Sequence, residues 1–265
     1  MRYWLLKLYA SFVGVGRWAI CLRDTTQSTF KRLPSYSLLL DQLYQIGVLS
    51  LPVVAITGFS TGLVLAAQAF YQLGDKGLAS ATGLLVGKGM LTEVGPVLTA
   101  FMVTGRVGSA MTATIGTMRV TEQIDALKTM SVNPLRYLVA PRVISSILML
   151  PALTVFSAVT GIFGGYLISV HVFGMAPEAY FNPMPAEITT YDLAIGIIKA
   201  LVFGFLISTI ACYQGLNTKG GASGVGRSTT TSVVVAYSCI LIINFILTVS
   251  LNSLHIVLQD YLGWR

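Results

Sequence analysis

The chain has 265 residues, of which 54% are hydrophobic and only 10% are charged, and its formal net charge is +7. Average soluble domains carry about 25% charged residues, so this composition excludes a disordered chain and argues against a soluble globule. Three cysteines are too few and too far apart for a disulfide scaffold, which leaves an integral membrane protein as the class.

The N-terminal region, residues 1–40, is expected to form an amphipathic helix in the cytoplasmic membrane interface. One helical stripe is apolar and three basic residues lie off it: Trp4, Leu8, Phe12, Val15, Ala19 and Leu22 against Arg2, Lys7 and Arg17. No small-residue cleavage site follows an apolar core, so the region is not a signal peptide. An ordinary helix packed on the bundle is the alternative.

Residues 41–265 hold five apolar stretches that are long enough to cross a bilayer as helices. The predicted core segments are 47–71, 89–115, 143–172, 193–214 and 231–256, which makes the fold all-α. In the first segment Gly58, Gly62 and Ala66 form a ridge of small residues, which lets membrane helices approach closely.

The distribution of lysine and arginine predicts the orientation of these five helices. Twelve of these residues lie in the N-terminal region and in alternate loops, against three on the other side. The N-terminus is therefore placed in the cytoplasm and the C-terminus outside it. The positive net charge mostly reflects this topology, so no nucleic-acid partner is expected.

Two charged residues, Glu93 and Arg106, interrupt the second span. They are 13 positions apart, or about 20 Å along a helix, and lie on different faces, so they cannot pair directly within one straight helix. A charge inside the membrane is costly unless it is paired or wetted. Each residue must therefore find a partner on a neighbouring helix, water or a ligand. Lys199 is embedded in the fourth span in the same way.

Residues 117–130 are predicted to form a short amphipathic helix in a cytoplasmic loop, ended by Asn133-Pro134. One face carries Val120, Ile124 and Leu127, and the opposite face carries Thr121, Glu122, Asp125 and Lys128. The pattern is compatible with a solvated connector and with a docking helix for a cytoplasmic partner. In the second case Glu122 and Asp125 would be charged contacts.

Residues 221–228 differ by one residue from the phosphate-binding loop GxxxxGK[ST], because Arg227 stands where lysine belongs. We interpret them as a glycine-rich turn, since the motif needs a strand before it and a soluble α/β domain around it. His171 and His255 have no cysteine or carboxylate at metal-ligand spacing. No catalytic, metal or cofactor site is expected in this chain.

Three runs in the second span and its loop resemble the MlaE family, the permease subunits of ABC lipid transporters that work with MCE-domain proteins. These runs are Glu93–Ala100, Gly105–Ala110 and Gly116–Leu127. Further matches are Gln42–Tyr44, Gly47–Ser50, Asn133–Leu135, Pro141-Arg142 and the glycine loop Gly220–Ser228. The similarity covers nearly the whole chain from about residue 40.

The resemblance implies a homodimer of five-span subunits in the bacterial inner membrane. Residues 117–130 would be a coupling helix that seats in a separate cytoplasmic ABC ATPase, which would bind ATP and Mg²⁺. The coupling residues would be Arg119, Thr121, Glu122, Gln123, Asp125 and Leu127. A periplasmic MCE-domain protein would form a hexameric ring. Phospholipid would lie between the two permease subunits, lined by Leu65, Gln68, Gln72, Leu73 and Glu93, with Lys88 and Arg106 as intramembrane polar residues.

Two positions depart from the pattern of that family. The family commonly has arginine directly before the glutamate that matches Glu93, and here Thr92 stands there. Lys88, one turn earlier, is the candidate for the missing positive charge. The family also commonly has glutamate where this chain has Thr114. These departures concern how phosphate is bound and leave the expected fold unchanged.

The expected function is that of a permease subunit that moves phospholipid or a related lipid between the inner and outer membranes. ATP would be hydrolysed by the partner, so this chain is not expected to be an enzyme. Two alternatives stay open. One is an ion-coupled secondary transporter that uses Glu93 and Arg106, although no internal repeat links the two halves of the chain. The other is a non-transporting membrane anchor that recruits an ATPase.

Overall fold

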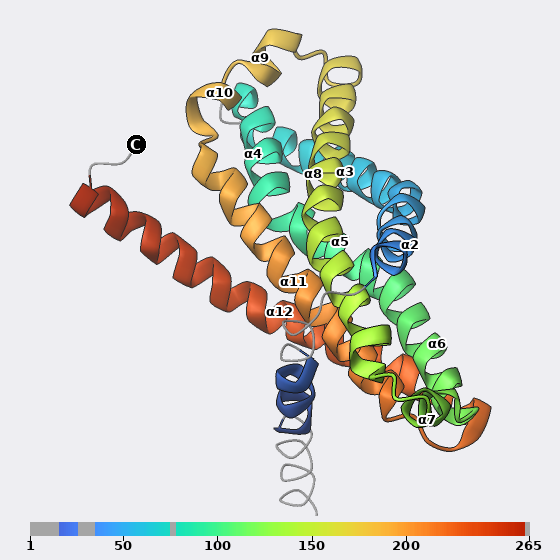
Figure 1. Ribbon diagram of the computed structural model, residues 1–265. Helices are drawn as coiled ribbons and strands as arrows, with labels where there is room; N and C mark the ends of the chain where they lie inside the picture. The colour runs from blue at the N-terminus through green and yellow to red at the C-terminus, as the bar shows by residue number, and fades with distance from the viewer. Residues whose placement is uncertain (1–15, 26–34, 75–77, 263–265) are drawn as a thin grey trace, which may run out of the picture.

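The computed structural model describes residues 16–25, 35–74 and 78–262, with side chains described as far as residue 257, and the elements of this part are all helical. Five helices are long and apolar enough to cross a membrane, which confirms the predicted class and the number of spans (Figure 1). They are Tyr36–Gly74, Ala79–Val120, Leu135–His171, Thr190–Leu216 and Gly221–Val257.

The first two spans are built from short segments joined end to end. The first consists of α2 (Tyr36–Ile46), η1 (Val48–Ser50) and α3 (Leu51–Gly74). The second consists of η2 (Ala79–Ala81), α4 (Thr82–Gly89), η3 (Met90–Val94), α5 (Gly95–Val103), η4 (Thr104–Gly108) and α6 (Ser109–Val120). The predicted boundary at residue 40 therefore falls inside α2, because the apolar pattern of the first span begins earlier than expected.

The remaining elements place two loops at opposite ends of the bundle (Figure 1). They are α7 (Gln123–Thr129), η5 (Leu135–Val139), α8 (Ala140–His171), α9 (Pro177–Phe181), α10 (Met184–Glu187), α11 (Thr190–Leu216) and α12 (Gly221–Leu262). The short helix α7 lies at one end, and α9 and α10 lie at the other. The C-terminal half of α12 diverges from most of the bundle in Figure 1 but keeps contact with α11, since Tyr191 donates to the carbonyl of Leu251 at 2.6 Å.

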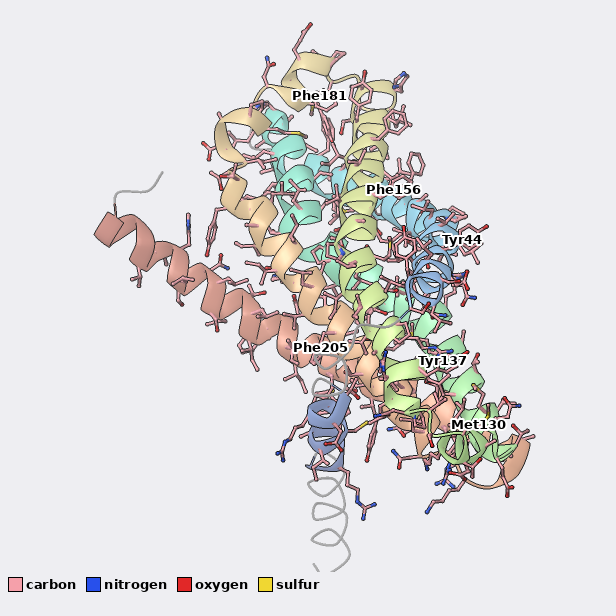
Figure 2. The ribbon with its side chains drawn as sticks, in the orientation of Figure 1. Tyr44, Met130, Tyr137, Phe156, Phe181 and Phe205 are labelled. Atoms are coloured by element: carbon pink, nitrogen blue, oxygen red, sulfur yellow. The ribbon has the colours of Figure 1, made fainter. Side chains whose placement is uncertain are left out.

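Helices α3 and α8 approach each other closely through the predicted ridge of small residues. A Cβ atom at Gly62 would lie 1.8 Å from the backbone oxygen of Gly161, so only glycine fits at this crossing. Large apolar side chains instead cover the outer surface: Tyr44 is 56% exposed, Phe156 37% and Phe181 45% (Figure 2). This inverted arrangement, with small residues inside and large ones outside, suits a lipid environment.

The predicted helix at residues 117–130 is wrong as a single element. Helix α6 continues to Val120, the chain turns at residues 121 and 122, and α7 covers only Gln123–Thr129. Glu122 has a φ of 61°, in the left-handed region, and this conformation cannot continue a right-handed helix.

The predicted glycine-rich turn at residues 221–228 is also wrong, because these residues form the first two turns of α12. The chain reverses just before them, where Gly220 and Gly221 have φ values of 92° and 66°. Two consecutive positive φ angles explain the glycine pair, since other residues rarely adopt them. Gly224 and Gly226 follow within the helix.

The predicted interfacial helix is described only in part. Trp4, Leu8, Phe12 and Val15 lie outside the described residues, whereas residues 16–25 are helical. In that segment Trp18 packs against the main hydrophobic cluster, Leu22 is half-buried and Ala19 is exposed. Its position in the membrane interface stays a prediction.

Candidate functional site

Both charged residues of the second span lie on π-helical segments, Glu93 on η3 and Arg106 on η4. In η3 the N–H of Gly95 donates to the carbonyl of Met90, five residues earlier. A Cβ atom at position 95 would lie 2.1 Å from that oxygen, so the π turn depends on glycine here. Single π turns within α-helices are frequent at functional sites, because they reorient side chains that a regular helix would spread apart.

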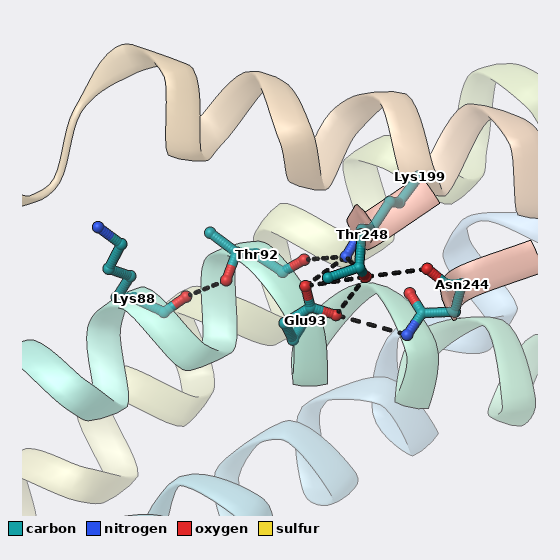
Figure 3. A network of polar contacts seen from close by, with 6 residues as sticks. All are labelled: Lys88, Thr92, Glu93, Lys199, Asn244 and Thr248. Carbon is teal, nitrogen blue, oxygen red and sulfur yellow. Dashed lines mark hydrogen bonds and ion pairs between the residues drawn. The ribbon is translucent and has the colours of Figure 1, made fainter. Parts of the chain in front are cut away.

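The partner that Glu93 needs is Lys199 on α11 (Figure 3). The ammonium nitrogen of Lys199 lies 2.6 Å from Glu93 Oε1. The side chain of Lys199 is 0% exposed and that of Glu93 is 36% exposed, so the carboxylate is the accessible half of the pair. Both residues can be placed within spans from the sequence, but their pairing cannot be predicted, because it depends on how the spans pack.

Two residues of α12 complete the network around this ion pair (Figure 3). Lys199 Nζ donates to Thr248 Oγ1 at 2.8 Å, and the hydroxyl of Thr248 lies 3.1 and 3.2 Å from the two carboxylate oxygens of Glu93. Asn244 Nδ2 donates to Glu93 Oε2 at 3.4 Å. The network therefore ties the second, fourth and fifth spans together.

Backbone chemistry supplies a further acceptor for Lys199. Pro96 has no N–H to donate to the carbonyl of Thr92, four residues earlier, and Lys199 Nζ donates to this carbonyl at 3.1 Å. Close approach of α11 is possible because a glycine, Gly196, faces η3. A Cβ atom at Gly196 would lie 2.2 Å from the carbonyl oxygen of Leu91.

Lys88 pairs with an acid on another helix, and its role in supplying the charge that Thr92 lacks stays a prediction. Lys88 Nζ lies 3.6 Å from Asp192 Oδ1, and its side chain is 50% exposed. Asp192 also accepts from the backbone of Thr189 and caps the start of α11. The pair thus links α4 to α11 near the end of the bundle that carries α9 and α10, and it has no direct contact with the carboxylate of Glu93.

Arg106 has partners on the first span. Its Nη1 donates to the carbonyl of Gln45 at 3.1 Å and to Ser50 Oγ at 2.7 Å. The same guanidinium lines a cavity together with Thr114 and Arg142. Glu93 and Arg106 therefore belong to separate polar regions, as their spacing along the second span predicts.

The residues predicted to line a lipid cavity are distributed over two regions of the molecule. Gln68 and Gln72 are exposed on α3, while Leu65 and Leu73 are half-buried. Leu65 packs against the buried cluster that contains Val86 and Met90. The described polar partners of Glu93 lie on α11 and α12, so the structure joins Glu93 to those helices and not to the two glutamines. Their role in lipid binding stays a prediction.

Helix α7 is attached to the bundle through its apolar face. Ile124 is 2% exposed and packs in a cluster that includes Ile115 of α6, Val143 of α8 and Cys212 of α11. Leu127 lies half-buried against this cluster. Ile124 thus connects α7 to three spans.

The polar face of α7 carries Asp125, which is ion-paired, and the turn before α7 carries Glu122, which has no ion pair among the described residues. Asp125 Oδ1 accepts from Lys128 Nζ at 2.9 Å, and Asp125 Oδ2 accepts from Arg119 Nη1 at 2.8 Å. The hydrogen bond from Lys128, reinforced by Arg119, lowers the pKa of Asp125 below its ordinary value. Within the described part of the chain Glu122 forms no ion pair, and Thr121, Glu122 and Gln123 are exposed. Of the two predicted charged contacts, Glu122 is the one available to a partner.

Comparison with known proteins matches this chain to a permease family and to several relatives. The family model described as Permease MlaE matches residues 39–250, which include the larger part of every span. A probable ABC transporter permease protein of Rickettsia conorii is 45% identical over 83% of this chain and 86% of its own length. A second one, from Synechocystis, is 42% identical over 94% and 92%. The intermembrane phospholipid transport system permease protein MlaE of Haemophilus influenzae is 36% identical over 80% and 82%.

Proposed function

The chain belongs to the MlaE permease family, and from this premise we propose that it is the permease subunit of an ATP-driven ABC transporter that moves phospholipid between the inner and outer membranes. The family match over residues 39–250 carries the proposal, because it includes the intramembrane ion pair and α7 within one alignment. The relative in Haemophilus influenzae bears phospholipid transport in its name.

In this proposal α7 receives the movement of a separate cytoplasmic ATPase, which binds and hydrolyses ATP with Mg²⁺. The exposed residues Thr121, Glu122 and Gln123 provide the contact surface, while Arg119 and Asp125 stiffen the turn between α6 and α7. The buried Ile124 passes the displacement to α6, α8 and α11. This orientation puts the N-terminus in the cytoplasm and the C-terminus in the periplasm, as the lysine and arginine distribution predicts.

A second copy of the chain and a periplasmic MCE-domain protein, as a hexameric ring, complete the assembly. The far half of α12 supports the dimer, because Ile242, Phe245 and Val249 are 61, 71 and 51% exposed there. Phospholipid then lies between the two copies, against Leu65, Gln68, Gln72 and Leu73 of α3 and the exposed carboxylate of Glu93. Because the charge of Lys199 neutralises that of Glu93, the site has little net charge that would repel a lipid head group.

Purification in mild detergent tests the proposal through the proteins and lipids that accompany the chain. We expect mass spectrometry to find an ABC ATPase and phospholipid with the wild type. Glu122→Lys should release the ATPase, since it reverses an exposed charge that has no internal partner. Glu178→Lys, an exposed acid on α9 at the opposite end, is the matched control and should retain it.

The alternatives predict different outcomes, the first in sealed vesicles and the second in the same preparation. An ion-coupled transporter would carry lipid without any ATPase and would stop when the proton gradient is removed. A mere anchor would bring the ATPase but no phospholipid after delipidation. Retention of the ATPase by both charge-reversed variants would contradict the role given to α7.

A further inference from the structure

A cavity of about 270 Å³ lies between α2, η4, α6 and the start of α8, elements that lie toward α7 and away from α9 and α10 in Figure 1. Its polar lining comes from Gln42 and Gln45 of α2, Arg106 of η4, Thr114 of α6 and Arg142 of α8. The two arginines come from different spans, so the packing of the helices, and not the sequence, brings their charges to one cavity.

The charges of this cavity are not balanced within the described part of the chain. No described carboxylate lies within ion-pair distance of either guanidinium, and the lining itself contains no acid. Positive charges on membrane-spanning helices are unfavourable without a counter-charge. The cavity therefore has the electrostatics of an anion site.

Hydrogen-bond donors remain available for such an anion. A guanidinium has five N–H donors. The contacts of Arg106 leave from Nη1 to Gln45 and Ser50, and that of Arg142 leaves from Nη1 to the carbonyl of Leu138 at 2.7 Å. The other nitrogens of both side chains can serve a ligand, and the planar fork of arginine matches phosphate oxygens in a bidentate manner.

One wall of the cavity is apolar. It is formed by Ile46, Leu49, Val107 and Met111; Leu49 is 44% exposed and supplies most of the accessible apolar surface, since the other three are buried. A phosphate that carries an apolar substituent can therefore place its charge on the arginines and its substituent along this wall. An inorganic anion has no apolar surface to bury, so the apolar wall would add nothing to its binding free energy.

We propose that this cavity binds the phosphate group of an anionic ligand through Arg106 and Arg142, at a site separate from the Glu93–Lys199 pair. Two sources share this chemistry: the head group of an anionic phospholipid in the cytoplasmic leaflet, and free inorganic phosphate. The apolar wall favours the lipid. About 20 Å of helix separates Arg106 from Glu93, so occupation of one site leaves room for the other.

Thr114 offers a way to change the charge of this cavity at an exposed position. It is exposed, and its hydroxyl donates only to the carbonyl of Ala110, one turn earlier. Thr114→Glu places a carboxylate in the lining beside the arginines and supplies the missing counter-charge. Thr114→Gln adds a side chain of the same size without charge, so it is the matched control.

The test uses the purified full chain in detergent, without ATPase or ATP, so its outcome is independent of the transport proposed above. Native mass spectrometry measures the affinity for palmitoyl-oleoyl-phosphatidylglycerol, and isothermal titration measures that for sodium phosphate. We expect Arg142→Gln to weaken phosphatidylglycerol binding by about tenfold, because it removes one charge-assisted hydrogen bond. Thr114→Glu should weaken it by a similar factor, because its carboxylate competes with the phosphate for the arginines, and Thr114→Gln by less than about twofold. Circular dichroism and size-exclusion profiles verify that the variants fold.

The two sources give different results. If the lipid is the ligand, phosphate neither binds measurably nor displaces phosphatidylglycerol. If free phosphate is the ligand, it binds with the same dependence on Thr114→Glu and Arg142→Gln, while phosphatidylglycerol binding is insensitive to both. Equal affinity of all variants for both probes would overturn the proposal. So would an equal loss in Thr114→Gln and Thr114→Glu, because the effect would then be steric.

Discussion

Replacing Glu93 by glutamine tests how the ion pair stabilises the bundle. The substitution keeps the shape of the side chain and removes the charge that faces Lys199. The ammonium of Lys199 is 0% exposed, and in the described residues Glu93 is the only carboxylate within ion-pair distance of it. Breaking a buried ion pair from one side costs about 3–5 kcal/mol. Because the side chain of Glu93 is 36% exposed, water compensates in part, and we expect a loss of about 3 kcal/mol.

The reverse substitution, Lys199→Met, should cost less. Glu93 then keeps its contacts with Thr248 and Asn244 and its access to solvent, so the expected loss is about 1–2 kcal/mol. The double variant removes both charges and should be more stable than Glu93→Gln alone. The free energies form a double-mutant cycle that isolates the interaction between the two side chains.

Unfolding of the purified chain in mixed micelles, followed by circular dichroism as the fraction of denaturing detergent rises, measures these differences. The expected order of stability is wild type, Lys199→Met, the double variant and Glu93→Gln. Additive losses in the double variant, or a larger loss for Lys199→Met than for Glu93→Gln, would refute the argument from asymmetric burial.

The remaining predictions concern single side chains on η3, α11 and α7. Gly196→Ala should separate α11 from η3 and lower the unfolding midpoint. Gly89→Ala should leave the midpoint unchanged, because its new Cβ meets no atom within 4 Å, and equal midpoints of the two variants would contradict the close approach of α11. Ile124→Ala should cost about 2–4 kcal/mol and raise amide exchange in α7, which unchanged exchange would disprove. Glu122→Gly should stabilise the turn by about 1 kcal/mol, since glycine adopts a φ of 61° without strain, and a lower unfolding midpoint would speak against this. The pKa of Asp125 is lower in the folded chain than its ordinary value of 3.8. The stabilisation by its ion pairs is therefore complete above pH 3.8 and is lost as the pH falls through the pKa of the folded chain. Above about pH 4, titration of Asp125 should not affect the protection of α7 amides from exchange.

The class of the fold and its five spans follow from the sequence, because the length and apolarity of a membrane helix are local properties. The ridge of Gly58 and Gly62 is likewise predictable from the sequence, since close helix packing requires small residues. The break at Glu122 was not predictable, because a left-handed glutamate leaves no compositional sign. The helical start of α12 was missed for the opposite reason: glycine suggests a turn, yet residues 221–228 are helical.

The candidate site could be predicted only as far as its charged members. The sequence places Glu93, Arg106 and Lys199 in membrane spans and requires a partner, water or a ligand for the first two. Which helix faces Glu93 depends on the π turn of η3 and on the approach of α11 at Gly196, and both are tertiary features. The pairing of Lys88 with Asp192 was missed in the same way, because those residues are more than 100 positions apart.

Transfer of phospholipid between two populations of vesicles tests the central claim most directly. The chain is reconstituted in donor vesicles with its ATPase and its MCE-domain partner, and labelled phospholipid is followed into acceptor vesicles with and without ATP. We predict transfer that requires ATP and is lost in Glu122→Lys but kept in Glu178→Lys. Transfer at the same rate without ATP, or in the absence of the ATPase, would contradict the account.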